Sequence, residues 1–283
     1  MSYKIVADSC CELPEQLKND SRFELVPLTL IVGEDYEKQD DESFNQREFL
    51  DAVAACPKCP KSACPSPERY MEAYKSEAEH IYAVTLSSQL SGSYNSAVLG
   101  KNLYHDTYGD KDIYVVDSRS ASCGETQLVY RIMELEEAGL SFDEITEKIG
   151  QYVKELHTYF VLETLETLRK NGRLSRVKAL VASTLNIKPL MAGDNGSIVQ
   201  LGQGIGMKKA LAKLVDTAVR DVKASAYPEN DRRLMISHCN NPEAADSVRR
   251  GIEEKLRVRE VVIMDTAGIS SMYASDGGVV VTL

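Results

Sequence analysis

The chain has 283 residues, of which 43% are hydrophobic, and a formal net charge of −10. Because single hydrophobic cores rarely grow beyond about 250 to 300 residues, we expect two domains. The acidic balance argues against a nucleic-acid partner, since phosphate backbones bind to basic faces. We find no signal-peptide pattern and no window of eighteen apolar residues, and the seven cysteines follow no evenly spaced framework. These features predict a soluble protein in the reducing cytoplasm.

The first half of the chain alternates predicted strands and helices. Strands are expected at residues 4–9, 23–33, 81–86 and 112–118, and helices at 43–55, 67–79, 96–104 and 141–156. Ser43 with Gln46 and Ser141 with Glu144 have the spacing of capping boxes. Pro67 lies at a first helical position, where its missing N–H costs nothing. This βαβ alternation predicts a parallel sheet with helices on both faces, that is, a three-layer α/β domain.

The second half has a different pattern. Asn195-Gly196 lies between two apolar runs and predicts a β-hairpin, while Gly172 is expected to end a short helix. Further helices are expected at 207–224 and 242–256, and strands at 232–238, 259–267 and 277–283. A hairpin implies antiparallel pairing. We therefore predict a second α/β domain with a mixed or antiparallel sheet, and divide the chain into domains 1–160 and 161–283.

Hydroxyl side chains gather where the predicted parallel strands end. The stretch SSQLSGSYNSA, residues 87 to 97, follows one strand, and VADSCCELP and VVDSRSASCGE place Asp-Ser at the ends of two others. In open α/β sheets, ligands bind beyond the carboxyl ends of the strands, where helix N-termini offer free N–H groups. Such a cluster suits a carboxylate or phosphate. The alternative is that Ser9, Ser91 and Ser118 simply cap helices.

These motifs resemble those of the DegV family of bacterial fatty-acid-binding proteins. The resemblance rests on VADSCCELP, VPLTLIVG, SACPSPERY, LSSQLSGSYNSA, VVDSRSASCG, ETLETLRKNGRLSR and IKPLMAGDNGSI, which span residues 6 to about 198. It implies a two-domain α/β fold with a long-chain fatty acid between the domains, no cofactor and no catalysis by the chain itself. The family also implies that a separate fatty-acid kinase receives the bound acid, and transient contact with a membrane is compatible with such a role.

The resemblance implies a set of ligand-binding residues, with some departures from the family pattern. Ser91 matches the serine expected at the carboxylate, and Ser62 keeps the first hydroxyl of a Thr-Ser-Gln-Pro motif. A family arginine is kept as Arg173, a second one is replaced by Ile205, and Tyr273 stands where a histidine is expected. The full set of expected ligand-binding residues is Ser62, Ser91, Gly92, Ser93, Arg173 and Tyr273. These departures leave fatty-acid binding plausible and put docking to the family's kinase in doubt.

The acyl chain would need an apolar tunnel. Burying each methylene contributes about 0.8 kcal/mol, so the tail would supply most of the affinity. The segment VKALVASTLNI, residues 177–187, is apolar nearly all round and is expected either to line such a tunnel or to be an ordinary buried helix.

Three other kinds of site compete with this reading. Cys56, Cys59 and Cys64 have metal-like spacing, although structural zinc needs four ligands. The glycines of LGQGIGMKKA, residues 201–210, loosely resemble a dinucleotide-binding loop. The alternative from a different functional class is a serine-dependent acyl hydrolase, with Ser91 as nucleophile and His238 as base, although no GxSxG motif is present.

Overall fold

The first of the two large sheets is built entirely from parallel strands, as the sequence predicts. The computed structural model describes residues 2–174, 177 and 186–283. Within them, the strands in spatial order are β2 (Phe23–Val26), β1 (Tyr3–Asp8), β6 (His80–Thr85) and β7 (Asp112–Asp117). The central strands β1 and β6 are almost fully buried, which is typical of parallel sheets covered on both faces.

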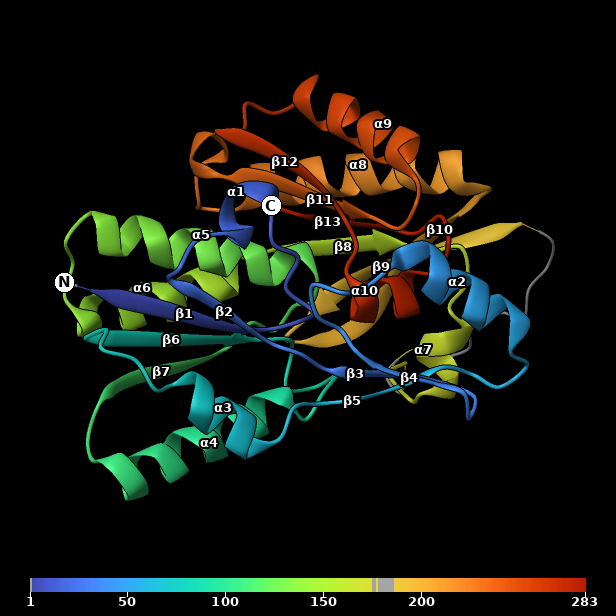
Figure 1. The fold of residues 1–283 in the computed structure, drawn as a ribbon. Helices are drawn as coiled ribbons and strands as arrows, with labels where there is room; N and C mark the ends of the chain where they lie inside the picture. The colour runs from blue at the N-terminus through green and yellow to red at the C-terminus, as the bar shows by residue number, and fades with distance from the viewer. Residues whose placement is uncertain (1, 175–176, 178–185) are drawn as a thin grey trace.

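Helices cover both faces of this sheet (Figure 1). On one side lie α3 (Pro67–Ala73) and α4 (Ser93–Tyr108), and on the other α5 (Cys123–Glu137) and α6 (Phe142–Glu155). The predicted capping box of α6 is confirmed, since the Ser141 side chain and the Glu144 side chain each bond the other's backbone N–H. Pro67 also lies at the start of α3, after Ser66 as the cap.

The second large sheet is mixed, as predicted. Its strands in spatial order are β10 (Ser197–Ile205), β9 (Ile187–Asp194), β8 (Thr158–Val161), β13 (Val279–Thr282), β11 (Arg233–His238) and β12 (Glu260–Asp265). Only β11 and β12 pair in parallel; the other neighbours are antiparallel. The hairpin between β9 and β10 turns at Asn195 and Gly196, whose φ angles of 47° and 82° explain why these two residue types stand there.

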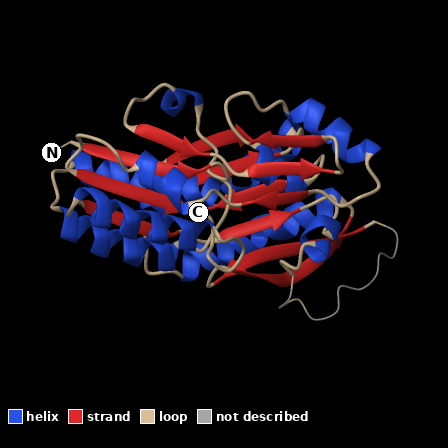
Figure 2. Cartoon of the chain, turned by 60° about the horizontal axis from the view of Figure 1, so that its bottom comes forward, coloured by secondary structure: helices blue, strands red, loops and turns tan. Residues whose placement is uncertain are grey.

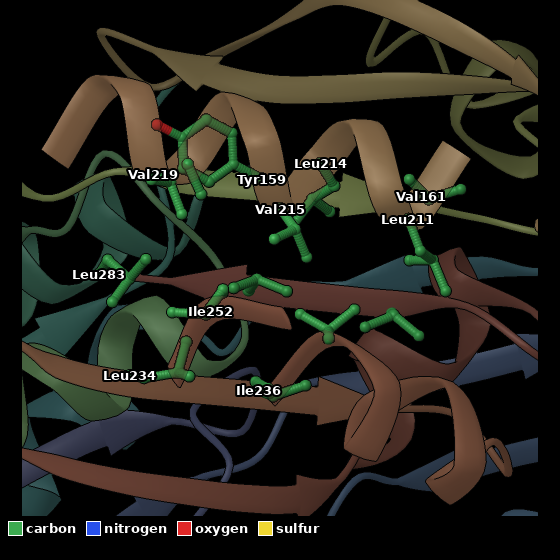
Figure 3. Packing of buried hydrophobic residues seen from close by; sticks show 14 of the residues in the cluster. Tyr159, Val161, Leu211, Leu214, Val215, Val219, Leu234, Ile236, Ile252 and Leu283 are labelled. Carbon is green, nitrogen blue, oxygen red and sulfur yellow. The ribbon is translucent and has the colours of Figure 1, made fainter. Parts of the chain in front are cut away.

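The molecule is a stack of layers in which α5 lies between the two large sheets (Figure 1). The outer face of the second sheet is covered by α8 (Met207–Ala224) and α9 (Pro242–Glu253). Apolar side chains of α8, β8, β11 and α9 fill the space between them (Figure 3), among them Leu214, Val215 and Ile236. On the inner face, α5 packs against β11 and β13 as well as against the first sheet. In Figure 2 the strands run roughly along the length of the molecule.

Two details of the predicted elements are wrong. The strand expected at 23–33 is divided at Pro27, which has no N–H for a sheet ladder, into β2 and β3 (Thr29–Val32). Strand β3 belongs to a separate small sheet with β4 (Tyr36–Gln39) and β5 (Lys61–Ala63). The cap of α2 (Gln46–Ala55) is Asn45, whose side chain accepts from the N–H of Glu48, so Ser43 does not form the expected capping box.

Three short α-helices, α1 (Glu15–Lys18), α7 (Glu166–Lys170) and α10 (Gly268–Ala274), and one 3-10 helix, η1 (Glu229–Asp231), complete the described part. The sequence patterns did not predict α10. Its first two N–H groups donate to the buried carboxylate of Asp40, at 2.8 and 2.9 Å. A residue just after β4, early in the chain, therefore holds a helix near the C-terminus. The predicted domain boundary near residue 160 stays a prediction. None of the described helices is long and apolar enough to cross a membrane.

Candidate functional site

A cavity of about 110 Å³ lies where the carboxyl ends of the parallel strands meet the second sheet. Loops after β1, β6 and β7 form one wall, and β8, the β9–β10 hairpin, β13 and α10 form the other. Most of its lining is apolar, including Leu86, Leu90, Phe160, Leu162, Ile198 and Val280. A chamber with this lining suits a hydrocarbon chain better than a charged metabolite.

Two of the predicted ligand-binding residues, Arg173 and Tyr273, line this cavity. The half-buried Arg173 is held in place because its Nε donates to the carbonyl of Leu90, at 3.1 Å. Burial raises the pKa of Tyr273, while the nearby charge of Arg173 and the hydroxyl of Ser62 lower it. Arg119, which the sequence did not single out, also lines the cavity. The site therefore combines an apolar interior with cationic and hydroxyl groups.

The first serines of the stretch SSQLSGSYNSA tie the loop to its neighbours. The Ser87 hydroxyl is fully buried and donates to the carbonyl of Gly196 at the tip of the hairpin, at 2.7 Å. The Ser88 hydroxyl donates to the carboxylate of Asp117, at 2.5 Å. The Ser87 hydroxyl thus joins the first sheet to the second, and the Ser88 hydroxyl joins the loop after β6 to the end of β7.

The later residues of the same stretch lie at the start of α4. Ser91 is half-buried and its hydroxyl accepts the N–H of Ser93, at 3.2 Å, while Gly92 is exposed and lies against Cys64. The Ser93 hydroxyl is fully buried and pairs with the Tyr70 hydroxyl, at 2.7 Å. None of the three residues lines the cavity described above. The structure thus places Arg173 and Tyr273 in the cavity wall, Ser62 on β5, and Ser91, Gly92 and Ser93 where the adjoining loop enters α4.

Several polar cavity residues were missed by the sequence analysis. Ser120 and Thr158 line the cavity from opposite sheets and share a hydrogen bond of 2.7 Å. Ser122 and Ser270 line it as well. The VVDSRSASCG motif pointed to this region through Ser118, but that hydroxyl donates to the backbone of Ser120 instead. Ser270 lies on α10, so no local pattern marked it.

An acidic side chain lies directly behind this wall. The carboxylate of Glu12 accepts from the Ser122 hydroxyl, at 2.7 Å, and from the Ser237 hydroxyl, at 3.3 Å. Complete burial raises the pKa of Glu12 to about 7. The Ser122 hydroxyl of the cavity wall therefore donates its proton away from the cavity, to a carboxyl group that titrates near neutrality.

The competing sites receive no support. Within the described ranges, no cluster of potential metal ligands includes Cys56, Cys59 or Cys64. The glycine-rich segment 201–210 joins the end of β10 to the start of α8, but β10 pairs antiparallel with β9 and therefore does not belong to a parallel βαβ unit. Residues 178–185, the greater part of the segment expected to line a tunnel, lie outside the described residues.

The geometry also does not join the two residues of the hydrolase alternative. His238 ends β11, is buried, and accepts the N–H of Asn241 at Nδ1, at 3.3 Å. Its nearest acid is Asp265, at 3.4 Å. His238 does not line the cavity, and neither does Ser91. A nucleophile and base in hydrogen-bonding reach are the minimum for such catalysis, and the described residues show no such bond between them.

The chain is similar over its whole length to proteins of one family. The family model described as "Uncharacterised protein, DegV family" matches residues 2–282. A DegV domain-containing protein of Streptococcus pneumoniae is 35% identical over 282 residues, covering 98% of this chain and 97% of the relative.

Two solved structures share the fold. A DegV family protein from Ruminococcus gnavus, solved with vaccenic acid, has a TM-score of 0.96 and 49% identity, with complete coverage of both chains. The Streptococcus pneumoniae Fatty Acid Kinase (Fak) B3 protein, loaded with linoleic acid, has a TM-score of 0.87 and 32% identity, covering 100% of this chain and 99% of the other. From the motifs, the fold and these matches together, the chain belongs to the DegV family.

Proposed function

We propose that this protein binds one long-chain fatty acid in the cavity between its two large sheets and acts as a carrier rather than as an enzyme. The observation that carries the proposal is the apolar cavity itself, with Arg173 and Tyr273 in its lining and Ser62 beside them. The acyl chain would occupy the apolar interior, and the carboxylate would be held by these residues together with Ser91 and Gly92 of the adjoining loop. Ser93 would support that loop through its bond to Tyr70.

The energetics of this arrangement favour a fatty acid. A dozen buried methylenes contribute on the order of 10 kcal/mol before association costs. Each hydrogen bond to a carboxylate adds about 1.5 to 3 kcal/mol and fixes the orientation of the head group. The vaccenic acid and linoleic acid bound by the two structural neighbours support the same ligand class.

Mass spectrometry of the denatured, purified protein tests the proposal. A carrier should release close to one equivalent of fatty acid per chain, whereas an acyl hydrolase should turn over acyl ester probes. Protein that contains no fatty acid, does not take one up on incubation, and cleaves the esters would refute the proposal.

Removing the Ser91 hydroxyl is expected to weaken fatty-acid binding by about 1 to 3 kcal/mol, because one carboxylate bond is left unmade. The Ser62→Ala variant should act in the same direction but less. A displacement titration with a fluorescent fatty acid measures both. Thr107→Ala is a suitable control, because Thr107 is exposed near the far end of α4 and should leave the affinity unchanged. Wild-type affinity in both serine variants would show that the head group lies elsewhere.

We further propose that the bound acid is offered to a fatty-acid kinase. The neighbour from Streptococcus pneumoniae carries the kinase in its name, which supports such a partner. Arg173 could steady phosphoryl oxygens as charge develops during transfer. Ile205 cannot, although it is 66% exposed at the end of β10, where the family resemblance leads us to expect an arginine. The chain should therefore be a poor substrate for a conventional kinase of this kind and should serve a divergent one, or storage and transport.

The Ile205→Arg variant is expected to accelerate acyl-phosphate formation with a conventional fatty-acid kinase, while the affinity for fatty acid stays the same. The assay combines purified kinase, nucleotide and loaded carrier, and follows acyl phosphate over time. Leu201→Arg places the same charge on another exposed residue of β10 and so separates a specific effect from a general gain in positive charge. Wild-type turnover as fast as that of a standard family member, unchanged by the new arginine, would refute this proposal.

A further inference from the structure

Four carboxylic acids are buried close together beside the cavity, Asp8, Glu12, Asp40 and Glu125. Within the described part of the chain, no Lys, Arg or His side chain forms an ion pair with any of them. Buried charges in proteins are normally paired, coordinated to a metal, or neutralised by a proton. The mechanism proposed above uses none of the four, so their neutralisation needs its own explanation.

Asp8 has the surroundings of an ionised carboxylate. One of its oxygens accepts the N–H of Cys10, at 3.1 Å, and the other accepts the N–H of Leu86, at 3.0 Å. Glu125, in the first turn of α5, has the opposite surroundings. It is completely buried, and neither of its carboxyl oxygens has a donor among the described residues. An ionised Glu125 would therefore bury a charge without a single hydrogen bond.

The two carboxyl groups lie next to each other. One oxygen atom of Asp8, one of Glu125 and the sulfur of Cys10 all lie within 4.8 Å of one another, so the two carboxyl groups are close neighbours. A bond between two carboxyl groups requires that one of them carries a proton. We propose that Asp8 and Glu125 share one proton in the folded protein, with Glu125 as donor and Asp8 as acceptor.

The neighbouring groups favour retention of this proton. Those that face the pair are acids, thiols or hydroxyls from several elements, namely Cys10, Cys11, Glu12, Asp40, Tyr70 and Ser93. Burial and the negative charge of Asp8 raise the pKa of Glu125 well above its usual range. Burial also raises the pKa of Glu12 to about 7 and that of Asp40 to about 6.

A proton held only by the folded state makes stability depend on pH. In the unfolded chain Glu125 ionises near its ordinary value of 4.5, whereas the folded chain keeps the proton. The contribution of Glu125 is thus lost as pH rises, and each pH unit above about 5 should favour unfolding tenfold until Glu125 ionises in the folded state. Glu12 and Asp40 add slopes of the same sign that end near pH 7 and 6. Burial also raises the pKa of Asp8 and of the thiols, so Glu125 is isolated by the difference between wild type and a Glu125 variant between pH 7.5 and 8.5 rather than by the wild-type slope alone.

The test compares wild-type protein with Glu125→Gln and Glu137→Gln in urea unfolding between pH 6 and 8.5. Glu137 lies on the same helix but is exposed, so its substitution is a matched control. We expect the unfolding constants of the wild type and of Glu137→Gln to rise equally steeply with pH. For each pH unit, the unfolding constant of Glu125→Gln should rise by a factor that is about ten times smaller. Parallel slopes for all three proteins would overturn the proposal.

Infrared spectroscopy gives a readout that does not depend on unfolding. At pH 8 the wild-type protein should show the C=O band of a protonated carboxylic acid in a desolvated site, and Glu125→Gln should lack it. If Glu125→Gln fails to fold, the C=O band of the wild type can be compared with that of Asp8→Asn instead. The band should shift in Asp8→Asn, because the group that accepts the hydrogen bond from Glu125 has changed. Absence of the band at pH 8 would overturn the proposal, and so would a stoichiometric divalent cation found by elemental analysis and lost in Glu125→Gln.

Discussion

The Ala121→Phe variant is expected to lose fatty-acid binding by about a hundredfold or more. Ala121 is half-buried on the loop between β7 and α5 and lines the cavity. A phenyl ring there would displace three or four methylenes of the acyl chain. At about 0.8 kcal/mol for each methylene, the loss is about 3 kcal/mol, which is roughly a hundredfold in the dissociation constant.

A displacement titration and the fatty-acid content of purified protein measure this loss. Ala138→Phe places the same ring on an exposed residue just after α5 and should bind as the wild type does. Urea unfolding at constant pH verifies that the cavity variant is folded. Retention of stoichiometric fatty acid with unchanged affinity in a folded Ala121→Phe protein would place the ligand outside this cavity.

The Asp40→Ala variant is expected to destabilise the protein by about 2 to 4 kcal/mol. The Asp40 carboxylate is the only partner recorded in the described residues for the first two N–H groups of α10, those of Gly268 and Ile269. Leaving two buried donors without a partner costs about 1 to 3 kcal/mol each. This cost is offset in part because the variant no longer buries a charged group. Because α10 carries Tyr273 into the cavity, fatty-acid affinity should fall as well.

Urea unfolding below pH 6 measures the effect most clearly, because burial raises the pKa of Asp40 to about 6 and the contribution of its carboxyl group to stability is lost as pH rises through that value. The neighbouring Asp41 is exposed and bonds only within its own turn in the described structure, so Asp41→Ala should change stability by less than about 0.5 kcal/mol. Equal stabilities of the two alanine variants would contradict the role given to Asp40.

Local patterns predicted those elements whose stability depends on neighbouring residues. The capping box at Ser141, the proline at the start of α3 and the Asn195-Gly196 hairpin are all set by bonds between residues at most a few positions apart. The misplaced cap of α2 is instructive. Asn45 and Ser43 are both good capping residues, and the choice of Asn45 leaves Ser43 in a turn with Asp41.

Elements held by distant partners could not be predicted in this way. The small sheet of β3, β4 and β5 begins just after Pro27, which local periodicity includes in one long strand, and it depends on pairing with residues of β5 about thirty positions later. Helix α10 has seven residues and no side-chain cap of its own; its N-terminal N–H groups are satisfied by Asp40, more than 220 positions earlier. A pattern within one window of the sequence holds no information about such a partner.

The sequence by itself determined the alternation of strands and helices, the hydroxyl-rich ends of the parallel strands and the family resemblance, because periodicity, caps and motifs are properties of contiguous residues. Only the tertiary structure decided which of those hydroxyls face the cavity. Ser87 and Ser93 form hydrogen bonds within the protein and do not line the cavity, whereas Ser120 and Ser122 line it. It also decided that Glu125 has no donor among the residues that the structure describes, since burial and hydrogen bonding depend on residues that are distant in sequence and meet only when both sheets are packed around α5.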